Sequence, residues 1–275
     1  MKTTNRFFIA IVVLLLLFNT SIFAQDDPPP RPEYVVATTF HWNMDNEDFD
    51  METWIAGEKE YLDKVIKKNE LIVGAGVYLH RFTADNTELI FVRTYASWAD
   101  IDKAQERNGE LAKEAWPDDE ERKAYEKKRS AYYVDYHSDE IRATMSGAKP
   151  MTEALGDDML LYLQISHFAF PEDGTNEEFN ELFKEYVENV FHKNEYIKAY
   201  YPLAHAWGSD RTEFVEAFFV NSLGDIANMF TRNGELEKEH WPDETSRKEF
   251  FQKADKYLTG VHGDYIYSIV EQLSK

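Results

Sequence analysis

The most constraining feature of this sequence is an internal repeat at an offset of 125 residues. The stretch from Arg107 to Asp118 has the sequence RNGELAKEAWPD, and the stretch from Arg232 to Asp243 has the sequence RNGELEKEHWPD. Over residues 107–142, 17 of 36 positions are identical at this offset, without a gap. A repeat of this quality indicates that one structural unit occurs twice in the chain.

Each unit spans about 110 residues, which is enough for a small domain. We place the first repeat at 33–146 and the second at 158–275, joined by a linker at 147–157. In the second repeat, seven apolar residues between Phe179 and Phe191 recur at helical spacing. A capping box, Thr175-Asn-Glu-Glu178, precedes them and marks the start of a helix.

The remaining elements follow from strand, turn and capping patterns. We expect strands at 34–41 and 159–168, and a hairpin of strands 71–82 and 88–95 that has its counterpart around the turn at 208–212. The second helices start at the caps Ser97 and Ser222 and end at the two Trp-Pro-Asp motifs, which also start further helices. Final strands are expected near 139–145 and 264–270.

The order β-α-β-β-α-α-β is that of a ferredoxin-like unit, so the predicted fold class is α+β. One face of such a sheet lacks helices, and two repeats can cover this face by packing sheet against sheet. The expected architecture is two tandem ferredoxin-like repeats that form an intramolecular pseudo-dimeric barrel.

This arrangement resembles the dimeric α+β barrel superfamily. The superfamily includes antibiotic-biosynthesis-type monooxygenases and the haem-binding chlorite dismutase and dye-decolorising peroxidase groups. The resemblance is one of topology and covers nearly the whole mature chain. The Gly-x-x-Asp-Gly motif of dye-decolorising peroxidases is absent from the sequence.

The first 24 residues are typical of a secretory signal peptide. Lys2 and Arg6 precede an apolar run of twelve residues at 7–18, and cleavage is expected after Ala24. The run is shorter than the roughly 20 residues that span a membrane, although an uncleaved anchor is the alternative. A Pro-rich spacer at 25–32 follows. We expect a periplasmic or secreted protein with no stable membrane insertion after cleavage.

Composition excludes several functional classes. A net charge of −21 argues against nucleic acids and anionic membranes as partners, because both require clustered Lys and Arg. The absence of cysteine excludes disulfides, thiolate zinc sites and a cysteine nucleophile. No phosphate-binding loop, hydrolase nucleophile motif or zinc-protease motif occurs. A small-molecule ligand is the expected partner, and the sequence leaves the oligomeric state open.

The candidate chemistry lies in histidines that recur in both repeats. Three pairs are related by the duplication, and the predicted topology brings each triplet to one end of its sheet. These pairs are His41 and His167, His80 and His205, and His137 and His262. Asp139 and Asp264 stand two residues after the last pair, so strand alternation places each Asp on the face of its His.

An Asp beside a His orients the ring and raises its basicity, which suits acid–base catalysis. We therefore name His137, Asp139, His262 and Asp264 as candidate catalytic residues. The candidate binding residues are His41, His80, His167, His205, Trp116 and Trp241. Structural or capping roles are the alternative for the histidines, as burial at a helix corner is for the tryptophans.

Other recurring residues receive simpler interpretations. Asn108 and Asn233 occupy late positions of the second helices, where they line a pocket or, by the preferred interpretation, lie on the solvated surface. No cofactor or metal site is predicted. Haem is a further candidate, for which any of the eight histidines could be the ligand.

Two functional hypotheses remain. The first is an exported small-molecule-binding protein or a cofactor-independent enzyme of the monooxygenase or isomerase type, with a site in the barrel repeats. The second is a non-catalytic exported binding or interaction protein, because no established catalytic motif is present. The sequence leaves open whether the protein is an enzyme.

Overall fold

The computed structural model describes residues 31–152, 154–156 and 158–275. The predicted signal peptide and most of the spacer lie outside the described residues. The first repeat contains β1 (Tyr34–His41), α2 (Met51–Tyr61), η1 (Leu62–Ile66), β2 (Ile72–Phe82), β3 (Glu88–Tyr95), α3 (Trp98–Ala115), α4 (Asp119–Ser130) and β4 (Ser138–Thr144). The second contains β5 (Leu160–Phe168), α5 (Asn176–Tyr186), η2 (Val187–Phe191), β6 (Ala199–Trp207), β7 (Glu213–Val220), α6 (Leu223–His240), α7 (Glu244–Asp255), β8 (Leu258–Ile269) and η3 (Glu271–Leu273).

The eight strands form one closed barrel in the order β1-β3-β2-β8-β5-β7-β6-β4. All pairs are antiparallel, and each repeat contributes four consecutive strands of the ring. The repeats join where β2 pairs with β8 and where β4 pairs with β6. The α+β class and the pseudo-dimeric barrel predicted from the sequence are confirmed.

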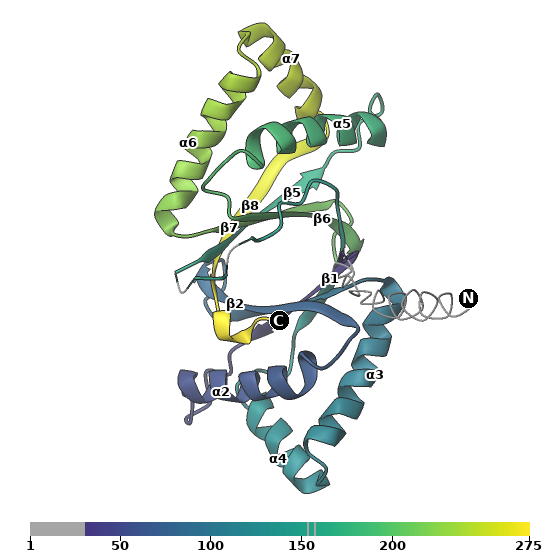
Figure 1. The fold of residues 1–275 in the computed structure, drawn as a ribbon, viewed down its shortest axis with the longest axis vertical. Helices are drawn as coiled ribbons and strands as arrows, with labels where there is room; N and C mark the ends of the chain where they lie inside the picture. The colour runs from purple at the N-terminus through teal and green to yellow at the C-terminus, as the bar shows by residue number, and fades with distance from the viewer. Residues whose placement is uncertain (1–30, 153, 157) are drawn as a thin grey trace, which may run out of the picture. The chain divides into compact units, whose positions relative to one another are not determined.

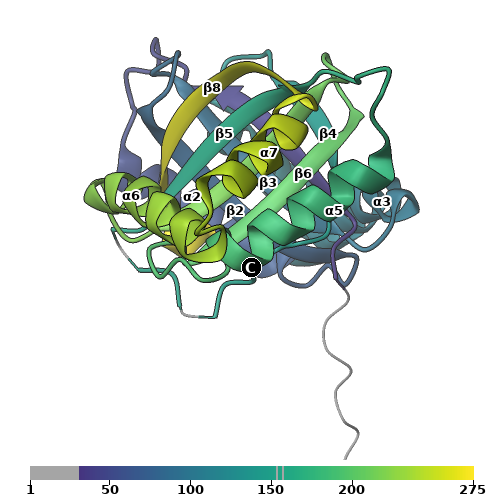
Figure 2. The same ribbon diagram turned by 90° about the horizontal axis from the view of Figure 1, so that it is seen from above.

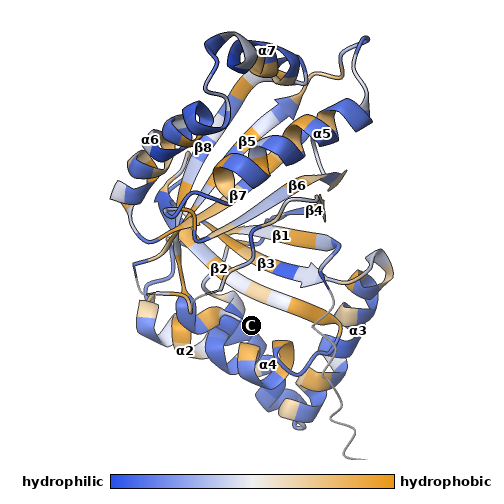
Figure 3. Ribbon diagram, turned by 45° about the horizontal axis from the view of Figure 1, so that its top comes forward, coloured by the Kyte–Doolittle hydropathy of each residue, from blue (hydrophilic) through white to orange (hydrophobic). Residues whose placement is uncertain are grey.

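The helices lie outside the barrel in two groups. Helices α2, α3 and α4 cover one side, and α5, α6 and α7 cover the other (Figure 1). Seen from above, α5 and α7 lie across the outer face of the second repeat's strands (Figure 2). Hydrophilic residues dominate α6 and α7, while the strands beneath are more hydrophobic (Figure 3). Each repeat therefore has its own apolar layer between helices and sheet, and the barrel interior is a third layer.

The helix starts follow the predicted capping chemistry, with two differences. Thr175 accepts a hydrogen bond from the Glu178 backbone, as in a capping box. The reciprocal bond is absent, because the Glu178 carboxylate instead contacts Tyr257 and Lys256. Ser97 occupies the N-cap of α3 but makes no side-chain cap bond, since its hydroxyl donates to the Asp100 carboxylate.

Both Trp-Pro-Asp motifs form the corner between two helices. The Trp116 ring stacks on Tyr125 at 4.1 Å between centroids, and the Trp241 ring lies 4.2 Å from Phe250. Both tryptophans are buried in the core of their repeat. Aromatic burial on this scale fixes the angle between the helices.

The last strand is longer than predicted. Strand β8 begins at Leu258 rather than near 264, because its first half pairs with the end of β5. Within it, a side chain at Gly263 would come within 2.8 Å of the Tyr265 hydroxyl, so glycine leaves room for that ring inside the barrel.

Candidate functional site

The six repeat-related histidines all lie at the end of the barrel that carries the two β-hairpins. His41 is opposite Glu88 at the start of β3, and His167 is opposite Glu213 at the start of β7. Strand alternation directs four of the six toward the barrel interior: His41, His80, His167 and His205. His137 precedes β4 and His262 lies within β8, and the alternation of these strands directs both to the opposite, helix-covered face.

His41 and His167 each contact the hairpin turn of their own repeat. His41 Nδ1 lies 3.2 Å from Asp85 and 3.3 Å from the Thr87 hydroxyl. His167 repeats this geometry with Asp210 at 3.3 Å and Thr212 at 3.0 Å. These contacts tie each strand end to the adjacent turn, a structural role that the duplication preserved.

His80 has a similar local partner, since its Nδ1 lies 2.8 Å from the Thr83 hydroxyl. Its counterpart His205 lies opposite Arg142, where β4 and β6 join the two repeats. Neither the His80 contact nor the position of His205 brings the histidines of one triplet together.

The predicted His–Asp pairs are present in both repeats. His137 lies 3.2 Å from Asp139, and His262 lies 3.4 Å from Asp264. All four side chains are about half exposed. Asp139 also accepts a hydrogen bond from Thr38, and Asp264 accepts one from the buried Tyr162. Their catalytic role stays a prediction, because they are neither enclosed in a pocket nor adjacent to the inward histidines.

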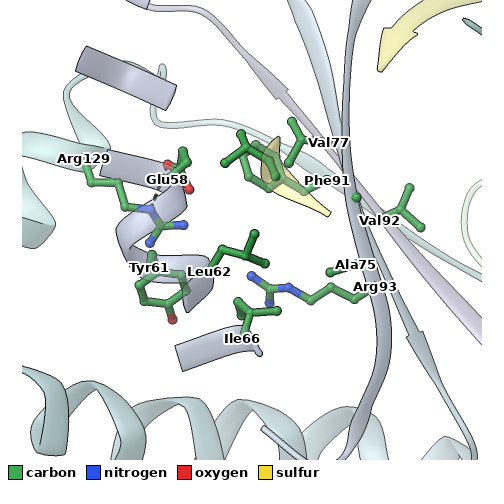
Figure 4. A pocket seen from close by; sticks show the side chains of 12 residues that line it. Glu58, Tyr61, Leu62, Ile66, Ala75, Val77, Phe91, Val92, Arg93 and Arg129 are labelled. Carbon is green, nitrogen blue, oxygen red and sulfur yellow. Dashed lines mark hydrogen bonds and ion pairs between the residues drawn. The ribbon is translucent and has the colours of Figure 1, made fainter. Parts of the chain in front are cut away.

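A pocket lies elsewhere, between the helices and the outer face of the sheet in the first repeat (Figure 4). Its free volume is about 30 Å³, and it opens to solvent. The walls are mostly apolar and come from α2, η1, β2, β3 and η3, with Leu62, Ile66, Ala75 and Leu273 among them. Three charged residues also line it: Glu58, Arg93 and Arg129.

Glu58 is the centre of a polar network beside this pocket. Its Oε1 accepts hydrogen bonds from Arg129 Nε at 2.8 Å and from the Tyr133 hydroxyl at 2.7 Å. Trp54 Nε1 in turn donates to the Tyr133 oxygen at 2.7 Å. Burial and the nearby Glu58 charge raise the pKa of Tyr133 well above its usual value. The Arg129 guanidinium lies 4.0 Å from the Tyr61 ring centroid, so an aromatic face supports it.

The second repeat has none of this network. At the 125-residue offset, the counterparts of Trp54, Glu58, Arg129 and Tyr133 are apolar: Phe179, Phe183, Ala254 and Leu258. The counterparts of Ala75 and Arg93 are Tyr200 and Phe218, which pack against Phe191 in the core. Where the first repeat has this partly open pocket, the second has packed aromatic rings, and its buried carboxylate, Glu216, accepts a hydrogen bond from Tyr200.

Residues shared by the two repeats do not predict this pocket, because its charged residues occur in one repeat only. The sequence signal for it is a position that is charged in one repeat and apolar in the other. Glu58 against Phe183 and Arg93 against Phe218 are two such positions.

Asn108 and Asn233 are buried, so the prediction of a solvated surface is wrong for both. Each accepts a hydrogen bond from a second buried asparagine, Asn69 or Asn194, at 2.8 and 2.7 Å. These amides connect the end of one helix to the middle of another. Their role is structural, because the loop before β2 or β6 needs polar partners inside an apolar core.

Comparison with solved structures shows the same barrel in other proteins. A candidate monooxygenase from Fusobacterium nucleatum matches 87% of this chain and 93% of its own, with a TM-score of 0.56 and 12% identity. A candidate monooxygenase from Lactobacillus acidophilus matches 87% of this chain and 94% of its own, with a TM-score of 0.51 and 9% identity. A candidate chlorite dismutase matches 88% of this chain and 96% of its own, with a TM-score of 0.51 and 11% identity.

This chain has the dimeric α+β barrel fold. No family model matches the sequence, and no curated protein matches it significantly. At these identities the similarity establishes the fold, and function has to be argued from the site.

Haem is the cofactor that the resemblance raises, and the pocket does not fit it. No histidine lines the pocket, and its free volume of about 30 Å³ is too small to enclose a porphyrin ring. Within the described part of the chain, no group of three or more potential ligand side chains is placed to hold a metal ion. Nor does any helix there have the length and apolar character required to cross a bilayer.

Proposed function

We propose that this is an exported small-molecule-binding protein whose ligand enters the pocket of the first repeat. The observation that carries the proposal is the asymmetry between the repeats. A buried carboxylate and two guanidinium groups line the pocket in one copy, where the other copy has aromatic packing. Polar groups facing a mostly apolar pocket are typical of ligand sites.

In this proposal the second repeat is the structural partner. Its strands complete the barrel, and its final segment reaches the first repeat, where Leu273 forms part of the pocket wall. Its own helix–sheet layer needs no ligand to be filled, since Tyr200 and Phe218 are almost completely buried.

Cofactor-independent monooxygenase or isomerase chemistry in the same pocket is the second candidate. Glu58 favours it, because this carboxylate lines the pocket and can accept a proton from a bound substrate. The names of two structural neighbours point in the same direction. Oxygen consumption or isomer formation that is lost in Glu58→Gln, with ligand binding retained, would support catalysis over binding alone.

Native mass spectrometry of protein purified from its own host tests the binding function. Ala75→Leu adds bulk inside the pocket, and Tyr200→Phe alters the equivalent position of the second repeat. We expect a retained ligand mass in the wild type and in Tyr200→Phe, and its loss from Ala75→Leu. No retained mass in the wild type, or equal retention in all three proteins, would contradict the proposal.

Export is proposed from the sequence of residues 1–24. N-terminal sequencing of the protein from a fractionated host culture tests it. A chain that begins at Gln25 in the periplasm or the medium is the expected result. A chain that retains Lys2 and Arg6 and stays with the cells would contradict it.

A further inference from the structure

The pocket of the first repeat contains a cation, Arg93, that has no carboxylate partner among the residues the structure describes. Arg93 extends from β3 to the helix side of the sheet, where Figure 4 shows its guanidinium beside Leu62 and Ile66. The counterpart in the second repeat is Phe218, which is buried among aromatic rings. The same position of the fold thus holds a charged residue in the first repeat and an apolar one in the second.

The protein supplies little to balance this charge. Arg93 interacts with the Tyr95 hydroxyl, and no carboxylate of the described residues lies within ion-pairing distance of it. The carboxylate that lines the pocket, Glu58, is paired with Arg129 instead. No carboxylate neutralises the Arg93 guanidinium at the pocket wall, so it is available to a negatively charged ligand group.

Arg129 offers a second set of donors to the same group. Its Nε donates to Glu58, and its two terminal nitrogens have no hydrogen-bond partner among the residues that the structure describes. Both arginines line the pocket, and in Figure 4 the Leu62 side chain lies between their guanidinium groups. Glu58 balances one of the two positive charges, so one net positive charge remains at the pocket for an anionic group.

On the basis of the proposed binding function, we infer that the ligand is an organic carboxylate, held by Arg93 and Arg129. The planar guanidinium pairs with a carboxylate through two parallel hydrogen bonds. The free volume of about 30 Å³ admits no more than a small group, and the pocket is open to solvent on one side. Glu58 in the same pocket and the net charge of −21 disfavour a multiply charged ligand. The apolar remainder of the ligand would extend through the open side of the pocket.

Matched pairs of small molecules test the inference: benzoate and benzamide, phenylacetate and phenylacetamide, hexanoate and hexanamide. Binding to the mature chain is measured by saturation-transfer NMR and titration calorimetry. We expect carboxylates to bind and their amides to bind roughly tenfold more weakly or not at all. Arg93→Gln should weaken carboxylate binding roughly 10- to 100-fold, and Arg93→Lys should restore part of it.

Arg107→Gln is the matched control, because it removes the same charge from an exposed helix of the same repeat. It should leave carboxylate affinity unchanged. The urea midpoint of each variant shows whether it is folded.

The outcomes separate this inference from the proposed function. If the amides bind as tightly as the carboxylates and Ala75→Leu abolishes both, the carboxylate inference fails and the pocket function stands. If no compound binds, or if binding is insensitive to Ala75→Leu, the pocket function fails and the inference with it. Carboxylate binding that is equal in Arg93→Gln and the wild type also overturns the inference.

Discussion

Lys149 and Lys275 make the same contact in opposite directions between the two repeats. Lys149 Nζ donates to the Asn194 carbonyl oxygen at 2.8 Å, and Lys275 Nζ donates to the Asn69 carbonyl oxygen at 2.6 Å. Each lysine follows the last strand of its own repeat and binds the end of a helix in the other. The segment after the last strand of each repeat therefore binds the other repeat, in addition to the β2–β8 and β4–β6 strand pairs.

Replacing either lysine should lower the free energy of unfolding. Lys149→Met or Lys275→Met leaves helix-end carbonyl groups without a donor, at a cost of about 1–3 kcal/mol. Lys123→Met is the control, because its ion pair with Glu120 is exposed and should contribute less than about 1 kcal/mol. Urea unfolding checks both. Equal stability of the three variants would show that the Lys149 and Lys275 contacts contribute nothing to the free energy of unfolding.

Much of the fold was predictable because the duplication allowed each element to be identified twice. Hydrophobic period, capping residues and Trp-Pro-Asp breaks were sufficient for the element order. The early start of β8 was not predictable. Gly260 and Gly263 suggest a turn locally, but pairing with β5 holds the segment as a strand.

The site was less predictable for a physical reason. Glu58, Arg93 and Arg129 come from a helix, a strand and another helix, and only tertiary packing brings them to one pocket. The histidines were correctly expected at one end of the sheets. Their side chains divide between two faces, a consequence of strand register that spacing alone leaves undetermined.

Arg129→Met should be strongly destabilising, because it leaves the buried Glu58 carboxylate without its cation. Losing one partner of a buried pair costs about 3–5 kcal/mol. The double variant Arg129→Met with Glu58→Met should recover much of this loss, since no uncompensated charge remains. Chemical denaturation of the single and double variants measures the coupling. A single variant that loses less than the exposed Arg107→Met would rule out a structural role for the pair.

Glu216 should make the protein less stable as the pH rises. Burial raises its pKa from the usual 4.5 to about 7, although the Tyr200 hydroxyl donates to it at 2.6 Å. Between these values the folded state holds a proton that the unfolded state has released, so the contribution of Glu216 to stability is greatest below pH 4.5 and is lost as the pH rises to about 7.

Glu216→Gln removes this contribution, because the amide keeps an acceptor for Tyr200 and does not ionise. The difference in unfolding free energy between pH 5 and pH 8 should change by about 3 kcal/mol relative to the wild type. Urea titrations at the two pH values measure it. Identical pH dependence in wild type and variant would mean that Glu216 does not titrate in this range.

Asn69→Ala should destabilise the first repeat by about 3 kcal/mol, because it removes three hydrogen bonds, two of them buried. The Asn69 side chain donates to the Ala104 carbonyl and to Asn108, and it accepts from the Leu71 backbone. Asn189→Ala, at an exposed helical site, is the control and should change stability little. Thermal and urea unfolding should agree, and a loss no larger than that of the control would contradict the assignment.

Leu273→Ala should enlarge the pocket and change its ligand preference. Leu273 is 2% exposed and belongs to the tail of the second repeat, yet its side chain forms part of the first repeat's pocket. Truncation of a buried leucine costs about 2–5 kcal/mol and leaves a cavity. Leu236→Ala, 3% exposed in the core of the second repeat, should have a similar cost without touching the pocket. Calorimetry should therefore find tighter binding of bulkier carboxylates only in Leu273→Ala. An identical ligand profile in the two variants would place the ligand elsewhere.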